Sequence, residues 1–122
     1  MRVTRVLHVS VNTHHTLAES QAFYAKLLGL DSKSRPDIPG VGGHWFAVGE
    51  SELHLVDSPA GDGPIRPTGN HFCVAVDDID TAIAELEAAG IEFLRASQGD
   101  VVQVWLTDPA GNTIELQQDR RL

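Results

Sequence analysis

Hydrophobic and polar residues alternate along residues 3–11 (VTRVLHVSV), near the start of the chain. A period of two in a stretch rich in β-branched residues is typical of a β-strand with two distinct faces. One face carries Leu7, Val9 and Val11, and the other carries Val6, His8 and Ser10. The pattern therefore predicts a strand with an imidazole on one of its faces.

The rest of the first half predicts a helix, a loop and a hairpin. Leu17, Phe23, Leu27 and Leu28 recur at roughly helical spacing, with Thr16 as a candidate N-terminal cap and Gly29 as a C-terminal stop. Residues 44–49 and 51–57 then read as two strands that turn at Gly49-Glu50. In the second of these strands, His54 lies between Leu53 and Leu55, which face the other way.

After a connector rich in proline and glycine, residues 58–69, the same order of elements restarts. The strand that begins at His71 alternates again, with His71, Cys73 and Ala75 on one face. A helix follows, for which we expect Asp80 as the cap and Gly90 as the stop. A strand over 91–96 and a hairpin over 101–118, turned at 108–112, complete the half.

Each half of the chain therefore predicts the order strand, helix, strand, hairpin, which is a βαβββ unit used twice. The spacing of polar landmarks agrees, since 46 positions separate His8 from His54 and 44 separate His71 from Glu115. We expect one α+β domain over residues 1–122, with a first module of about 1–57, a linker of 58–69 and a second module of about 70–118.

Four polar residues occupy equivalent places in this repeat. His8 and His71 lie in the first strand of each half, and His54 and Glu115 lie in the last. Their apolar neighbours face the other way, and we expect these neighbours to pack beneath the helices: Leu7, Val9, Leu53, Leu55, Phe72, Ile114 and Leu116. The four polar side chains would then line the opposite, concave face of a sheet.

Any one of these residues, taken alone, could be a hydrogen-bonded core residue or a solvated strand residue. A buried polar group without a partner costs about 1–3 kcal/mol, and four would rival a total stability of about 5–15 kcal/mol. Together they need one another, water or a metal ion as partners. Three imidazoles and a carboxylate without thiolate suit one divalent Zn, Ni, Fe, Mn or Co ion with an open coordination position.

Other candidates admit two interpretations. Trp45, Phe46 and Trp105 occur at matching places in the two hairpins, and they either wall a substrate pocket or pack in the core. Arg66 in the connector either binds an anionic substrate or is solvated. Cys73 is expected to pack as a small apolar residue beside the cavity.

Composition narrows the class of partner. The net charge of −8 argues against nucleic acid or an anionic membrane surface as a partner. The single cysteine excludes an intramolecular disulfide, and no segment resembles a signal peptide or a membrane span. These features together favour a cytoplasmic protein with a small-molecule substrate.

The chain resembles the vicinal oxygen chelate superfamily, which includes glyoxalases, bleomycin-resistance proteins and type I extradiol dioxygenases. The matching segments are VLHVSV, ESQAFYAKLLGL, SELHLVD, NHFCVAVDDID and DPAGNTIELQQ, which span nearly the whole chain. The resemblance implies a cupped, mixed eight-stranded sheet with helices outside and a homodimer, in which modules are sometimes exchanged. It also places His8, His54, His71 and Glu115 where the metal ligands of the superfamily lie.

The resemblance implies three alternatives for activity. The first is a metal-dependent, glyoxalase-like lyase or isomerase that chelates vicinal oxygens, with Glu115 as the base. The second is an Fe(II) dioxygenase that uses His8, His71 and Glu115 as a two-histidine, one-carboxylate triad. The third is a bleomycin-resistance-like protein that sequesters a drug without chemistry.

Overall fold

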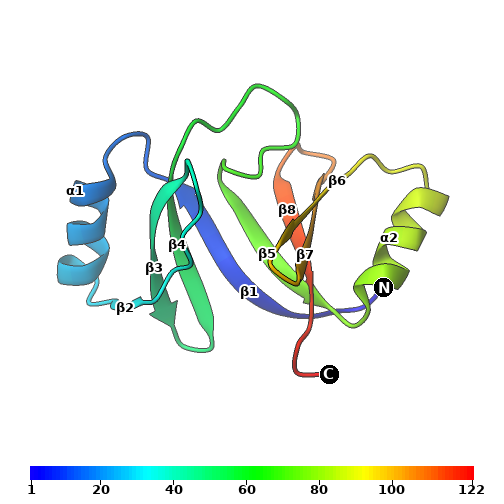
Figure 1. Cartoon of the computed structure of the whole chain (residues 1–122), viewed down its shortest axis with the longest axis horizontal. Helices are drawn as coiled ribbons and strands as arrows, with labels where there is room; N and C mark the ends of the chain where they lie inside the picture. The colour runs from blue at the N-terminus through cyan, green and yellow to red at the C-terminus, as the bar shows by residue number, and fades with distance from the viewer.

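In a computed structural model that describes residues 1–122, eight strands form one curved sheet with a helix at either side (Figure 1). The first half contains β1 (Val3–Asn12), α1 (Leu17–Ala22), a π-helical turn η1 (Phe23–Leu27), β2 (Asp31–Lys33), β3 (Gly42–Val48) and β4 (Ser51–Asp57). The second contains β5 (His71–Val76), α2 (Ile79–Ala88), β6 (Leu94–Gln98), β7 (Val101–Thr107) and β8 (Thr113–Gln118). The predicted doubled βαβββ order and the α+β class are confirmed.

The strand order β2-β3-β4-β1-β5-β8-β7-β6 places the two modules edge to edge. Within each module the first and last strands are parallel, β1 with β4 and β5 with β8. The modules meet through the antiparallel pair β1 and β5, so the first strands of the two halves form the middle of the cup. No helix of the chain is long and apolar enough to cross a membrane.

Thr16 occupies the predicted N-cap position of α1 without a side-chain capping bond, and the second helix starts earlier than predicted. The hydroxyl of Thr16 donates to the carbonyl of Thr13 and does not cap α1. The second helix starts at Ile79, so Asp78 is the cap and accepts a hydrogen bond from the backbone N–H of Thr81 at 2.9 Å. Asp80, the predicted cap, lies in the first turn, where its charge still favours the helix dipole.

The main apolar core lies between α2 and the second half of the sheet. It contains Val74, Val76, Ile79, Ala82, Ile83, Leu86, Val104 and Leu116. The first module has a smaller layer, in which Phe46 and Leu55 are fully buried. Its helix α1 has no buried residue, and Phe23, Leu27 and Leu28 in and after the π-helical turn are exposed. A π-turn shifts the phase of the apolar stripe, which a regular 3.6-residue pattern does not anticipate.

The expectation that Val9 and Phe72 pack beneath helices is wrong. The helices leave the middle of the sheet uncovered, since α1 packs on β3 and β4, and α2 packs on β8 and on the end of β5 that carries Val74 and Val76 (Figure 1). Val9 and Phe72 are register partners on the central pair and are 44% and 39% exposed. Leu7 also departs from the prediction, because the register shifts between Val6 and His8 and Leu7 lines the concave cavity.

The end of β8 is tied to the start of β1 by one buried carboxylate. Asp119 accepts hydrogen bonds from the hydroxyl of Thr4 at 2.6 Å and the backbone N–H of Arg121 at 2.9 Å, and Arg5 lies 3.6 Å away. The hydrogen bond from Thr4, followed by that from Arg121, lowers the pKa of Asp119 to about 2.

We expect Asp119→Asn to lower the melting temperature at neutral pH. The native carboxylate has a depressed pKa, so its contribution to stability is present above its ordinary pKa near 3.8 and is lost as the pH falls towards 2. The difference between wild type and variant should therefore shrink across that window. Thermal unfolding followed by circular dichroism checks this, with the exposed Asp62→Asn as control, and a constant difference down to pH 2 would contradict it.

Candidate metal and ligand site

The concave side of the sheet holds an open cavity of about 800 Å³. It contains the four polar residues singled out from the sequence, which arrive from four neighbouring strands: His54 from β4, His8 from β1, His71 from β5 and Glu115 from β8. All four are buried. Successive side chains of a strand point to opposite faces of the sheet. Each of the four residues occupies a position that points to the concave face.

Glu115 is the centre of this group. Its Oε1 lies 3.1 Å from Nε2 of His71 and 3.3 Å from Nε2 of His8. Its Oε2 accepts hydrogen bonds from the amide of Gln117 at 2.7 Å and that of Gln103 at 3.3 Å. Burial alone raises the pKa of Glu115, but the contacts with His71 and His8 outweigh it and hold that pKa well below the ordinary value. The carboxylate is therefore ionised and fixed in position.

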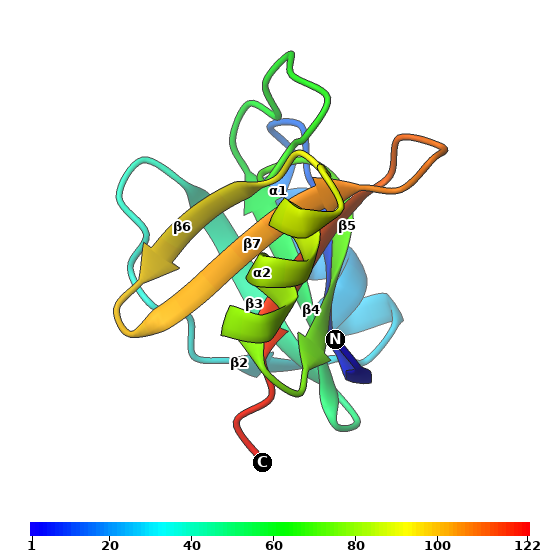
Figure 2. The same cartoon turned by 90° about the vertical axis from the view of Figure 1, so that its right-hand side faces the viewer.

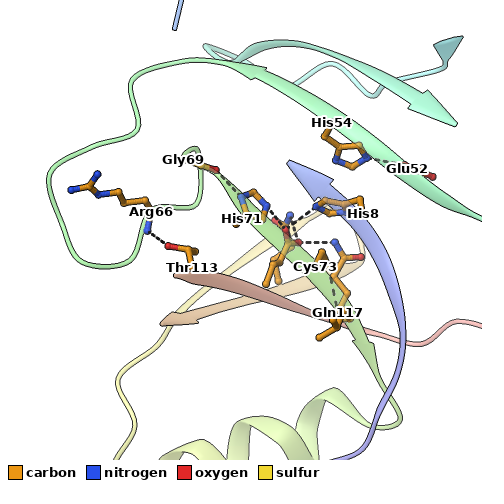
Figure 3. A network of polar contacts seen from close by, with 12 residues as sticks. His8, Glu52, His54, Arg66, Gly69, His71, Cys73, Thr113 and Gln117 are labelled. Carbon is orange, nitrogen blue, oxygen red and sulfur yellow. Dashed lines mark hydrogen bonds and ion pairs between the residues drawn. The ribbon is translucent and has the colours of Figure 1, made fainter. Parts of the chain in front are cut away.

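The orientation of His71 leaves its Nε2 facing that carboxylate. Its Nδ1 lies 2.9 Å from the carbonyl oxygen of Gly69, which can only accept, so Nδ1 carries the hydrogen (Figure 3). In a neutral ring, Nε2 then presents a lone pair to Oε1 of Glu115 at 3.1 Å, and the two acceptors repel. A cation between them, either a proton or a metal ion, removes the repulsion. Imidazoles that bind metals are commonly oriented by such a backbone contact.

Cys73 belongs to the same cluster, whereas the sequence predicted only that it would pack as a small apolar residue beside the cavity. It is the register partner of both His8 and Glu115, and donor atoms of these three residues all lie within 4.8 Å of one another (Figure 3). Burial, followed by the negative charge of Glu115, raises the pKa of the free thiol. The signal for Cys73 in the sequence was its place two residues after His71, on the same strand face.

The donor set fits a metal ion. Two ligands bound about 2.1 Å from one tetrahedral ion lie about 3.4 Å apart, close to the contacts of Glu115 with His8 and His71. The residues that could hold an ion are therefore His8, His71 and Glu115, with Cys73 as an additional soft donor.

His54 reaches the cavity but points elsewhere. Its ring is stacked between Trp45 and His8, with centroid distances of 3.9 Å on both sides. Its Nε2 lies 2.8 Å from Oε1 of Glu52, which also pairs with Lys33. Burial, followed by the neighbouring His8, lowers the pKa of His54 to about 4, so the ring is neutral. It joins the ion site only if its contact with Glu52 is released.

The predicted substrate contacts divide between the cavity and other places. Trp45 and Trp105 both line the cavity. Phe46 is fully buried, and its ring packs against His44 and Tyr24 on the other face of β3. Arg66 lines a separate pocket, its side chain directed away from the histidines (Figure 3). The structure thus does not bring Phe46 or Arg66 to the cavity.

The family is decided by comparison with known proteins. A family model described as the Glyoxalase/Bleomycin resistance protein/Dioxygenase superfamily matches residues 5–116. The chain belongs to this superfamily. Members of the superfamily usually bind a divalent metal ion and take small molecules as substrates.

One curated protein and two solved structures illustrate what the chain is similar to. A protein of Arabidopsis thaliana named Glyoxylase I 4 is 30% identical in an alignment of 125 positions. The alignment covers 95% of this chain and 71% of that protein. A hypothetical protein from Bacillus halodurans C-125 superposes with a TM-score of 0.75 at 18% identity, over 95% of this chain and 94% of the other. A superfamily member from Vibrio splendidus 12B01 gives 0.70 at 19% identity, over 97% and 100%. The two solved structures show the cupped fold that the sequence predicted.

Proposed function

We propose that the protein is a metal-dependent, glyoxalase-like enzyme of the lyase or isomerase type, acting on a small molecule with two vicinal oxygens. The observation that carries the proposal is the fixed Nδ1–H of His71, which turns Nε2 toward the ionised Glu115 and calls for a cation between them. His8 and Cys73 supply further donors at the same point. A divalent ion held by these residues would supply Lewis acidity for a carbonyl oxygen of the bound molecule.

The chain's own residues divide the remaining tasks. Gln103 and Gln117 hold Glu115 through its Oε2, which leaves Oε1 for the ion. We propose Glu115 as the base, which is the role predicted from the sequence, because its carboxylate is ionised and lines the cavity. Glu52 and His54, which line the same cavity and are hydrogen-bonded to each other beside His8, form a second acid–base pair.

Metal analysis of the protein purified without a histidine tag tests the proposal. We expect about one divalent ion per chain, removed by a chelator and restored by Zn, Ni, Mn, Fe or Co. Loading with Co(II) should give a thiolate-to-metal absorption band that is absent from Cys73→Ser if the thiol is a ligand. Protein that binds no metal but holds an aromatic drug tightly would instead favour sequestration.

One observation favours dioxygenase chemistry as the second candidate. Nε2 atoms of two histidines, His8 and His71, approach the same carboxylate oxygen, which is the donor set of a two-histidine, one-carboxylate Fe(II) site. Oxygen consumption with catechols by the Fe(II)-loaded protein, and none with Zn(II), would move the assignment to this reaction.

We also propose a homodimer formed through the convex face of β1 and β5. Val6, Val9 and Phe72 are exposed there on the central strands, between the two helices (Figure 1). Adjacent exposed apolar side chains on a sheet face are typical of an interface. Sedimentation analysis should find a dimer for the wild type, and Val9→Asp should weaken association by at least about tenfold. Ile91→Asp, at an exposed apolar site beyond α2, should not; a wild type that is monomeric at micromolar concentration would contradict the proposal.

A further inference from the structure

Basic residues are concentrated around the cavity in an otherwise acidic protein. Four of the nine Lys and Arg residues line it, against four of the seventeen Asp and Glu residues. The four basic residues are Arg5, Lys33, Arg35 and Arg120. The cavity is thus balanced in formal charge, although the chain as a whole carries −8.

Three of these four cations are already neutralised by the protein. Lys33 pairs with Glu52, Arg120 lies 3.3 Å from Asp100, and Arg5 lies 3.6 Å from Asp119. Arg35 forms no ion pair with any carboxylate of the chain. It is the one cation of the cavity wall whose charge the protein leaves uncompensated.

Arg35 is nevertheless held in place. It lies in the connection between β2 and β3, and its Nη2 donates to the carbonyl of Val41 at 2.7 Å. The guanidinium lies beside Gly43, where a Cβ would come within 3.1 Å of Nε and 3.2 Å of Nη2. The absence of a side chain at Gly43 makes room for the group. A fixed guanidinium loses little freedom on binding an anion, which favours affinity.

The hydrogen bonding of Arg35 is also incomplete. The Nε atom of Arg35 is buried and has no hydrogen-bond partner. The same is true of Nε1 of Trp105, a cavity residue that is only 8% exposed. A residue that served only to anchor the loop would be expected to use its buried donor, because an unpaired one costs about 1–3 kcal/mol. Both residues line the same cavity, but these two atoms are closed to solvent. The group of Arg35 that is left for a ligand oxygen is Nη1, which forms no hydrogen bond within the protein.

Taken with the function proposed above, on which it rests for the position of the chelating end, this arrangement identifies the substrate class. We propose that the cavity takes an anionic small molecule, whose vicinal oxygens lie at the His8–His71–Glu115 cluster and whose separate carboxylate or phosphate group is bound by Arg35. The connection between β2 and β3 and the β6–β7 hairpin project from the same side of the molecule (Figure 2). Residues of both segments line the cavity.

The two tryptophans of the chain provide the readout, since Trp45 and Trp105 both line the cavity. Quenching of their fluorescence is titrated with 2-oxoglutarate and with 2-oxopentanoate, two acids of equal chain length that differ by a distal carboxylate. Wild type should bind 2-oxoglutarate about tenfold more tightly. Arg35→Gln should bring the two within about twofold by weakening 2-oxoglutarate alone. Arg95→Gln removes the same charge from an exposed strand position outside the cavity and should preserve the preference.

Equal binding of the two acids by wild type, or an unchanged preference in Arg35→Gln, would overturn the proposal. Competition by inorganic phosphate but not acetate identifies a phosphate group, the reverse identifies a carboxylate, and no competition by either counts against an anion subsite. Arg35→Lys, which keeps the charge and loses the paired N–H geometry, should retain part of the preference, and it serves if the glutamine variant does not fold.

Titrations of chelator-treated and Co(II)-loaded protein separate this inference from the proposed function. If no metal binds and the Arg35-dependent preference persists, the enzyme assignment fails and the anion subsite stands. If Co(II) binds and the preference is absent, the anion subsite fails and the metal site stands.

Discussion

Replacing Glu115 by glutamine is expected to lower the affinity for a divalent ion by at least about 100-fold. The amide has nearly the same shape, so the contacts with Gln103 and Gln117 can be kept through its oxygen. The substitution removes the negative charge at Oε1, the atom that faces Nε2 of both His8 and His71 and that would bind the ion. The dissociation constant is obtained from Co(II) titration followed by absorption, with the retained metal measured after dialysis.

The control for this substitution is Glu87→Gln, which removes the same charge from an exposed position on α2. It should bind the ion as wild type does. A bound ion also stabilises the folded state, by about 2.7 kcal/mol at a free concentration of 100 times the dissociation constant. Added metal should therefore raise the melting temperature of wild type and of Glu87→Gln but not of Glu115→Gln. Undiminished metal binding by Glu115→Gln would refute the assignment of the ligand.

The positions of the cluster were predictable because strand alternation is a strong local signal. His8 and Glu115 each stand between apolar residues in a strand, His71 begins an alternating strand, and the repeat of the two halves places those strands at equivalent positions. The same rule applies to Cys73, two residues after His71. Cys73 was expected to pack as an apolar residue, because the strand pattern alone does not show that its register partners on the two neighbouring strands are His8 and Glu115.

What alternation does not fix is the rotamer or the neighbours of a side chain. His54 has the predicted strand face, yet its ring is stacked between Trp45 and His8 and bonds to Glu52. Arg35 lies in a connection without periodicity, and only its three-dimensional contact with Val41 and Gly43 directs it to the cavity. Likewise, the exposure of Phe72 depends on where the helices cross the sheet, which the strand pattern does not encode.

Gly43 is the position where the smallest substitution should have the largest effect on folding. An ideal Cβ at Gly43 would lie 2.3 Å from the carbonyl oxygen of Leu55 on the neighbouring strand. Because that atom belongs to the backbone, no side-chain rotation relieves the overlap, and β3 must move away from β4. We expect Gly43→Ala to lower the free energy of unfolding by about 2–3 kcal/mol, measured by urea denaturation.

Gly63→Ala is the matched control, since the nearest atom to its added Cβ is the carbonyl oxygen of Ile65 at 3.8 Å and its backbone is not left-handed. It should stay within about 0.5 kcal/mol of wild type. The two glycines also differ in function, because the Cβ at Gly43 crowds the guanidinium of Arg35. Gly43→Ala should therefore lose both stability and the preference for the dicarboxylic acid. A variant as stable as wild type would show that the strands yield at little cost, and the preference would then report on Arg35 alone.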